Sequence, residues 1–421
     1  MIKDSVIALV IKVMGSALGL CINWLLIKKV GVGEAGYYYL ALSYVALLRP
    51  ILEFGFNNLL LKNGIGDCSN KSNAIKVDKL FVAFTNALFV FAVFYSVYFF
   101  FIRELFDVES VKILIDYLLP SYFILVIIGF ISFFFQSEGK TIVSSLLVEP
   151  VYQFLFASSL VYFYVNGLEH VALYSLISSL IVLVISMTML IKMLIDSGAL
   201  KKYSLPNISF IKAVLKESLS IMTLSILAAL SNNLFQVILG NYVSSEELAI
   251  YSLSLRISIV ISFVLICVSK VSSPVISRLH SEGKQMELNF YLKKATVFSF
   301  VSSLVLGSLI MYFSSDLLSF FDNDLSNGNV ILIILCVGQV FNSLTGPVAS
   351  VLIMTGLTNY VRKVSVYSLI LSTTFAVLLI PIYGIYAASS IFSINMIFQN
   401  MTCYLIMKNK LDLNPLRLKV R

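Results

Sequence analysis

Charged residues are scarce in this chain. They make up 12% of its 421 residues, whereas a soluble domain averages about 25%. Hydrophobic residues reach 59%, and the mean hydropathy is +0.95. This composition excludes a solvated globular domain and indicates an integral membrane protein, and no bound cofactor is needed to explain it.

Cysteine and histidine are also few, with five and two residues. Four of the cysteines lie in apolar runs and none forms a CxxC pair, so we expect neither a disulfide framework nor a metal site. His170 and His280 are expected in loops, without a catalytic partner pattern. The start of the chain lacks a small-residue cleavage site after a short apolar core, so we expect a retained helix there and not a signal peptide.

Long apolar runs are abundant instead. A membrane-spanning helix needs about 20 mostly apolar residues, and the chain predicts twelve such spans joined by short links. We expect them at 6–27, 37–61, 80–102, 113–135, 142–165, 171–191, 218–240, 248–269, 295–313, 330–354, 361–381 and 384–407. The sequence therefore predicts an all-α integral membrane protein.

The basic residues are unevenly divided between the links. With a cytoplasmic N-terminus, 23 of the 30 Lys and Arg residues fall in inner segments, 4 fall in outer segments and 3 lie within spans. Because basic residues favour the cytoplasmic side of a membrane, both termini are expected there. The net charge of +8 is then explained by basic residues that face the anionic lipids of the cytoplasmic leaflet. We therefore expect no nucleic-acid partner.

The chain also repeats itself. With a shift of 213 residues, the first two predicted helices fall on the seventh and eighth without a gap, and EGKT at 138–141 echoes TGLT at 355–358. An even number of helices per half gives a parallel repeat about an axis along the membrane normal. We therefore expect two pseudo-symmetric six-helix lobes, 1–195 and 214–421, the second with a short basic tail, joined by a cytoplasmic linker at 196–213. The matched pairs are Ser5 and Ser218, Asn23 and Gln236, Glu34 and Glu247, Tyr38 and Tyr251, Leu40 and Leu253, and Leu42 and Leu255.

Three stretches resemble a known family. GVGEAGYYYLALSYVALLRPILEFGF resembles the start of the second helix of Wzx-type polysaccharide flippases, members of the MATE-like MOP exporter superfamily. LTGPVASVLIMTGLTNYVRK resembles the end of their tenth helix, and LIPIYGIYAASS resembles their eleventh-to-twelfth turn. The resemblance covers nearly the whole chain. It implies two six-helix lobes in a V, a central cavity, and an undecaprenyl-pyrophosphate type of lipid-linked oligosaccharide as cargo.

The resemblance also implies site residues. The related lipid II flippases carry arginines in helices 1, 2 and 8 of that cavity. Lys12, Arg49 and Arg256 lie in those helices here, with lysine replacing arginine in the first.

Charges within spans are rare and usually face a bundle interior or water. Here they are Lys12, Arg49, Glu53, Glu149 and Arg256. At a rise of 1.5 Å per residue, the two arginines lie roughly 12–18 Å from the outer ends of their helices, near mid-membrane. The other three lie roughly 9–12 Å from the cytoplasmic ends. The sequence thus predicts a middle layer of two arginines and an inner layer of mixed charge.

A guanidinium group is planar, permanently charged and able to bind two oxygens at once, which suits a pyrophosphate. Arg49 and Arg256 are therefore the predicted headgroup ligands. Two alternatives stay open for them: Arg49 could only neutralise Glu53, which shares its helical face with Asn57 one turn on, and Arg256 could hold helices together. Lys12 could snorkel to the inner headgroups.

Glu53 and Glu149 are the acids well inside the spans, so we expect one of them to carry a coupling proton or ion. Glu149 has no basic neighbour in sequence, which favours it, and Pro150 after it predicts a kink. The alternative for Glu149 is a buried acid held by a backbone or hydroxyl partner.

Amide side chains suit sugar recognition but also bond helices to one another, at about 0.6 kcal/mol each. We expect Asn57, Asn232 and Gln236 among the substrate-binding residues. The other amides on plausible inward faces are Asn58, Asn233, Gln339, Asn342, Asn395 and Gln399.

Three functions compete. The first is a flippase that moves a lipid-linked oligosaccharide (an O-antigen unit, or a capsule or lipid II-like glycan) across the bacterial inner membrane by alternating access, alongside a polymerase and other glycan-assembly proteins. The second is a cation-coupled MATE-type exporter of small molecules, but such exporters favour acidic cavities and the central layer here is basic. The third is a membrane glycosyltransferase, polymerase or ligase. That class usually has a large outer loop with paired arginines or acids, whereas the longest outer link, 313–329, has no basic residue. We therefore expect a transporter with no catalytic residue and no cofactor.

Overall fold

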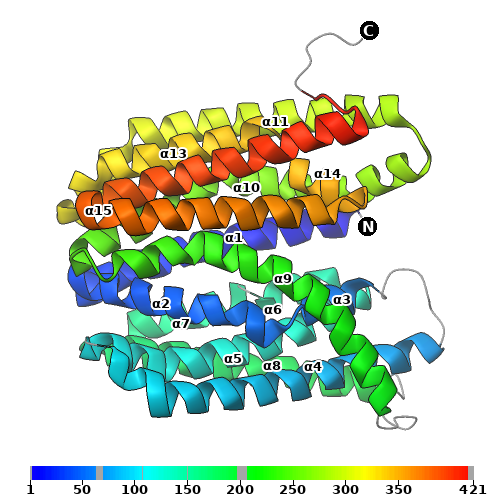
Figure 1. Ribbon diagram of the computed structural model, residues 1–421. Coiled ribbons are helices and arrows are strands. Elements are labelled where there is room, and N and C mark those ends of the chain that lie inside the picture. The colour runs from blue at the N-terminus through cyan, green and yellow to red at the C-terminus, as the bar shows by residue number, and fades with distance from the viewer. Residues whose placement is uncertain (1, 63–69, 107, 149, 197–205, 416–421) are drawn as a thin grey trace. The chain divides into compact units, whose positions relative to one another are not determined.

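The computed structural model describes residues 2–62, 70–106, 108–148, 150–196 and 206–415 (Figure 1). Within these ranges every regular element is a helix, and 10 helices are long and apolar enough to cross a membrane. The predicted fold class, an all-α multi-pass membrane protein, is confirmed.

The chain divides into two compact units, Met1–Ala229 and Leu230–Arg421. The division falls inside α9 (Ile208–Leu239), so this helix contributes to both units. The lobe ranges and the linker predicted at 196–213 stay predictions, and residues 197–205 of that linker lie outside the described residues.

The first unit is built around α5. This helix is apolar on all sides, and such helices are buried in the centre of a bundle. It packs against α2, α3, α4, α6 and α8, and Figure 1 shows it beside α8. The elements of this unit before α9 are α1 (Ile2–Val30), α2 (Val32–Glu53), α3 (Phe56–Lys62), α4 (Asn70–Val97), the π-helical turn Tyr98–Ile102, the short 3-10 turn Arg103–Leu105, α5 (Glu109–Ser137), α6 (Thr141–Val148), α7 (Pro150–Tyr162) and α8 (Leu168–Asp196).

The second unit is built around α13 in the same way. α13 packs against α10, α11 and α15. α13 corresponds to the tenth predicted span, and α5 corresponds to the fourth. These are matched positions in a repeat of six helices, so the same helix is central in each half. The elements after α9 are α10 (Ser245–Ser281), α11 (Gln285–Tyr312), α12 (Ser314–Phe321), a 3-10 segment Asn323–Gly328, α13 (Asn329–Leu344), α14 (Val348–Met354) and α15 (Thr358–Leu411).

The internal repeat is also visible in burial. Asn23 and Gln236 occupy matched positions and both are buried, as are Tyr38 and Tyr251. Matched burial follows when two halves place the same helical faces against their own cores.

Several predicted spans are interrupted. The second (37–61) is α2 followed by α3, and the tenth (330–354) is α13 followed by α14. The eleventh and twelfth run on as α15, which kinks at Gly384, where φ is 53° and ψ is −131°. The longest outer link contains α12, and both histidines lie in terminal helical turns and not in loops. Periodicity could not reveal these features, because apolar runs continue across each break.

Candidate functional site

Arg49 and Glu53 form an ion pair on the last turn of α2. Arg49 Nε lies 2.8 Å from Glu53 Oε1, as a four-residue spacing on a helix predicts. The Arg49 side chain is nevertheless 46% exposed, and that of Glu53 is 17% exposed. The ion pair is therefore present, and the guanidinium group keeps an accessible side.

The helix that carries this pair does not continue to Asn57. α2 ends at Glu53, and Phe54 and Gly55 adopt φ values of 47° and 75° before α3 begins. The prediction that Asn57 extends the face of Arg49 and Glu53 is wrong, because two left-handed residues redirect the chain.

Asn57 packs inside the first unit. A Cβ added to Gly129 on α5 would lie 3.8 Å from Asn57 Oδ1, so this glycine leaves room for the amide. Asn57 is buried, and its Oδ1 has no hydrogen-bond partner among the described residues.

The polar face of α1 holds Lys12, which is half-buried. Ser16 Oγ donates to the Lys12 carbonyl over 3.2 Å, and Asn23 Nδ2 donates to the Gly19 carbonyl over 2.7 Å. These bonds give the Ser16 hydroxyl and the Asn23 amide a partner within α1, and Gly19, which has no side chain, lets α7 approach the same face.

Gln153 on α7 is a candidate that sequence reasoning missed. Its Nε2 would lie 3.5 Å from a Cβ added to Gly19, and its Oε1 is buried without a partner among the described residues. The one available signal was its position four residues after Glu149. Glu149 itself lies outside the described residues.

The second unit carries the remaining candidates. Arg256 is half-buried on α10, and Asn232 is exposed on α9. Gln236 is buried, and its Nε2 donates to Ser252 Oγ over 2.7 Å. Among the candidates in the described part of the chain, the structure brings Arg49 and Glu53 together. Lys12, Arg49, Glu53 and Asn57 belong to the first unit, and Asn232, Gln236 and Arg256 belong to the second.

A second ion pair was not predicted. Lys76 Nζ on α4 lies 2.6 Å from Glu138 Oε1, and the two side chains are 6% and 19% exposed. The partners are 62 residues apart, so no local spacing in the sequence predicts the pair. This pair ties the N-terminal part of α4 to the turn between α5 and α6.

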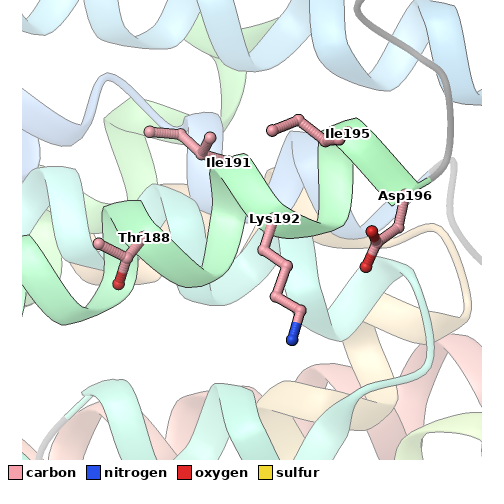
Figure 2. A pocket seen from close by; sticks show the side chains of 5 residues that line it. All are labelled: Thr188, Ile191, Lys192, Ile195 and Asp196. Atoms are coloured by element: carbon pink, nitrogen blue, oxygen red, sulfur yellow. The ribbon is translucent and has the colours of Figure 1, made fainter.

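A groove of about 290 Å³ lies on the last turns of α8 (Figure 2). It is lined by Thr188, Ile191, Lys192, Ile195 and Asp196. None of the predicted site residues lines it, and its open, largely apolar wall is what a membrane-facing helix presents to lipid. Among the described residues, no group of three His, Cys, Asp or Glu side chains is arranged to hold a metal ion.

Solved structures of transporters share this fold, among them the following three. An inward-facing multidrug resistance MATE family transporter of the MOP superfamily aligns with a TM-score of 0.78 and 14% identity, over 97% of this chain and 98% of the other. The lipid II flippase MurJ, in an inward closed conformation, aligns with a TM-score of 0.77 and 14% identity, over 97% and 88% of the two chains. A MOP-superfamily transporter from Pyrococcus furiosus, described by the reverse polarity of its binding pocket, aligns at 0.65 and 14%, over 98% and 95%. Curated protein sequences give no match.

These likenesses and the helix pattern define a multi-pass membrane protein with the fold of MOP-superfamily transporters. A family model described as polysaccharide biosynthesis protein matches residues 1–280, and one described as MatE matches residues 220–378. Because the first model matches more than half of the chain, the chain belongs to the polysaccharide biosynthesis protein family. Its family and its structural neighbours are those of transporters and flippases, and not of catalytic enzymes.

Proposed function

We propose that this protein is a flippase that moves a polyprenyl-pyrophosphate-linked oligosaccharide, such as an O-antigen repeat unit, from the cytoplasmic to the periplasmic leaflet of the bacterial inner membrane. The exposed guanidinium group of Arg49, held by Glu53 within a long apolar segment, is the observation that carries the proposal. Family membership supports a glycan as the cargo. A polymerase and other glycan-assembly proteins are the expected partners.

The headgroup requires a binding site of this kind. Stranding one charge in hydrocarbon already costs several kcal/mol or more, and a pyrophosphate carries at least two. Arg49 and Arg256 each offer a planar fork of donors for phosphate oxygens, and one comes from each unit. Alternating access would then present the bound headgroup to each leaflet in turn.

Glu53 has a defined role in this cycle. It lies 2.8 Å from Arg49 and holds the guanidinium group in place while the site is empty. A pyrophosphate offers more acceptor oxygens than one carboxylate, so Glu53 yields to the substrate.

The other candidates take supporting roles. Lys12 adds a positive charge on α1, and Asn232 is exposed for contact with sugar hydroxyls. Asn57 and Gln236 are buried in this structure, so they would contact a sugar only after the surrounding helices move.

A cation-coupled exporter of small molecules is the second candidate. The MatE match over residues 220–378 favours it. An exporter of organic cations needs an unneutralised acid at the site, whereas Glu53 is paired with Arg49.

Reconstituted vesicles separate the two functions. Wild-type protein should move a fluorescent polyprenyl-pyrophosphate-linked sugar between leaflets, and inorganic pyrophosphate should compete. The Arg49→Ala/Arg256→Ala variant should incorporate equally and move none. Transport of a fluorescent organic cation, with no movement of the lipid-linked sugar, would establish the exporter instead.

Orientation is tested by reporter fusions. The excess of lysine and arginine in the predicted inner segments supports a cytoplasmic location for both termini. A reporter that is active only in the periplasm should be active after Asn166 or Ser326 and silent after Lys202 or Lys284. The opposite pattern would reverse the proposed direction of transport.

A further inference from the structure

The break between α2 and α3 has an unusual backbone. Phe54 and Gly55 both have positive φ, 47° and 75°. The left-handed region is open to glycine, but it costs roughly 1–2 kcal/mol for a residue with a Cβ. Phe54 therefore keeps this conformation only because its surroundings enforce it.

Aromatic contacts hold one side of the break. The Phe54 and Phe56 rings lie 6.0 Å apart, and the Phe56 ring meets Phe130 of α5 edge-on, also at 6.0 Å. Phe56 and Phe130 are fully buried. The start of α3 is thereby fixed to the central helix of the first unit.

The backbone of α9 lies against the other side. A Cβ added to Gly55 would lie 2.6 Å from the carbonyl oxygen of Ser218, 3.0 Å from Ile221 Cβ and 3.0 Å from the Met222 nitrogen. Two of these three atoms belong to the backbone, so no side-chain rotation could make room. Only glycine fits at this position.

This contact lies directly after the ion pair. Glu53 is the last residue of α2, two positions before Gly55, and Arg49 is one turn earlier. The direction in which α2 ends determines where the guanidinium group of Arg49 is held.

The helix that makes the contact also continues into the second unit. Val214 and Ile221 of α9 pack in the core of the first unit. Beyond the division at Ala229, Phe235 meets Phe392 with ring centroids 6.3 Å apart. A shift of α9 would therefore reach Gly55 through the backbone.

We infer that Gly55 is a positioning residue, whose close approach to the α9 backbone at Ser218–Met222 sets the end of α2 and holds Arg49 for the pyrophosphate headgroup. This inference rests on the proposed function. It adds that the Arg49 end of α2 follows α9 as the protein changes state.

The test measures apparent KM and maximal rate separately in the vesicle assay. Gly55→Ala should raise the KM for the fluorescent polyprenyl-pyrophosphate-linked sugar about tenfold or more, the effect expected when a charged hydrogen bond is misplaced. Gly139→Ala is the matched control: its φ is 78°, and a Cβ there meets nothing within 4 Å. It imposes the same backbone cost and should leave KM unchanged.

A double variant distinguishes positioning from general damage. In an Arg49→Lys background, which should keep part of the activity, Gly55→Ala should raise KM less than in the wild type, because the bidentate guanidinium fork that Gly55 positions is gone. A purely structural role would lower the maximal rate by the same factor in both backgrounds. If Gly55→Ala does not fold, Phe54→Gly replaces it, since glycine accepts positive φ, removes the ring anchor and should also raise KM.

The outcomes separate the two proposals. A normal KM in Arg49→Ala would overturn the proposed function. Loss of flipping in Arg49→Ala, with wild-type KM in folded Gly55→Ala or Phe54→Gly, would overturn the positioning role alone.

Discussion

The same four residues, Ser-Glu-Gly-Lys, form a turn in each unit: 137–140 at the end of α5 and 281–284 at the end of α10. The backbones match closely. Gly139 and Gly283 have φ values of 78° and 70°. Lys140 N donates to the Phe135 carbonyl and Lys284 N to the Leu279 carbonyl, both over 3.0 Å. These are glycine-terminated helix ends, in which a left-handed residue lets the following N–H groups satisfy the last carbonyls.

The charges in the two turns have different partners. Glu138 reaches the buried Lys76 of α4 at 2.6 Å. Glu282 pairs with the exposed Lys284 of its own turn at 2.9 Å. The local sequence therefore determines the backbone conformation of the turn, and the neighbouring helix determines which group the glutamate pairs with.

The two helices that carry the arginines also match in position along the repeat and differ in their charged residues. At the shift of 213 residues, Arg49 on α2 matches Ser262 on α10, and Arg256 on α10 matches Ser43 on α2. Both serines are buried and donate to carbonyls of their own helices, Ser43 to Tyr39 and Ser262 to Ile259. The arginines thus stand six residues apart in the repeat, about 9 Å along a helix.

The largest effect is expected when the two arginines of this comparison are replaced. Arg49→Ala and Arg256→Ala should each leave expression intact and stop flipping, because the pyrophosphate loses a charged ligand at mid-membrane. Appearance of surface glycan and accumulation of its lipid-linked precursor measure the loss.

The matched serines supply the controls for that experiment. Ser43→Ala and Ser262→Ala should flip normally, since each removes only a bond to its own helix. Lysine at position 49 or 256 should restore part of the activity, because it offers a point charge without the bidentate fork. Normal glycan export by both Arg49→Ala and Arg256→Ala would show that the arginines only pack helices.

A smaller effect is expected where the two turns differ. Glu138→Gln leaves the Lys76 ammonium buried without its partner, so it should lower the free energy of unfolding by about 3 kcal/mol. Thermal unfolding of the purified protein in detergent measures this, with Glu282→Gln as the matched variant in the other turn. Equal melting temperatures for the two variants would show that the buried pair adds nothing.

These cases show how much the sequence could predict. Apolar length and charge asymmetry were enough for the fold class, because the bilayer imposes both. The break between α2 and α3 was not predictable, since Phe54 adopts a left-handed conformation that only its tertiary contacts stabilise.

The candidate site was predictable in part for the same reason. The Arg49–Glu53 pair follows from a four-residue spacing, and the structure shows it. The Lys76–Glu138 pair and the contact of Gln153 with Gly19 join distant segments of the chain. No local pattern encodes such contacts.

The third expected effect concerns pH. The match of EGKT at 138–141 with TGLT at 355–358 corresponds to a shift of 217 residues. At that shift Glu149 matches Val366, an exposed valine in the other half, so the repeat does not require an acid there. We propose that Glu149 takes up and releases a proton in each cycle. Glu149→Gln should then flatten the pH dependence of flipping in vesicles, and Glu53→Gln should not. A wild-type pH profile in both variants would reject proton carriage by these acids.

The smallest effect is expected at the exposed turn of the second unit. Lys284 donates a hydrogen bond to Glu282 and holds the pKa of that carboxyl below its usual range. A carboxyl with a lowered pKa contributes stability above its unfolded pKa, and that contribution is lost as the pH falls through the folded pKa. Water screens this pair almost completely, because both groups are exposed. Glu282→Gln should therefore melt within about 1 °C of the wild type at neutral pH, and acidification to about pH 3 should lower both melting temperatures equally. A drop of several degrees at neutral pH that disappears in acid would show that this turn also depends on its ion pair, and the contrast with Glu138 would fail.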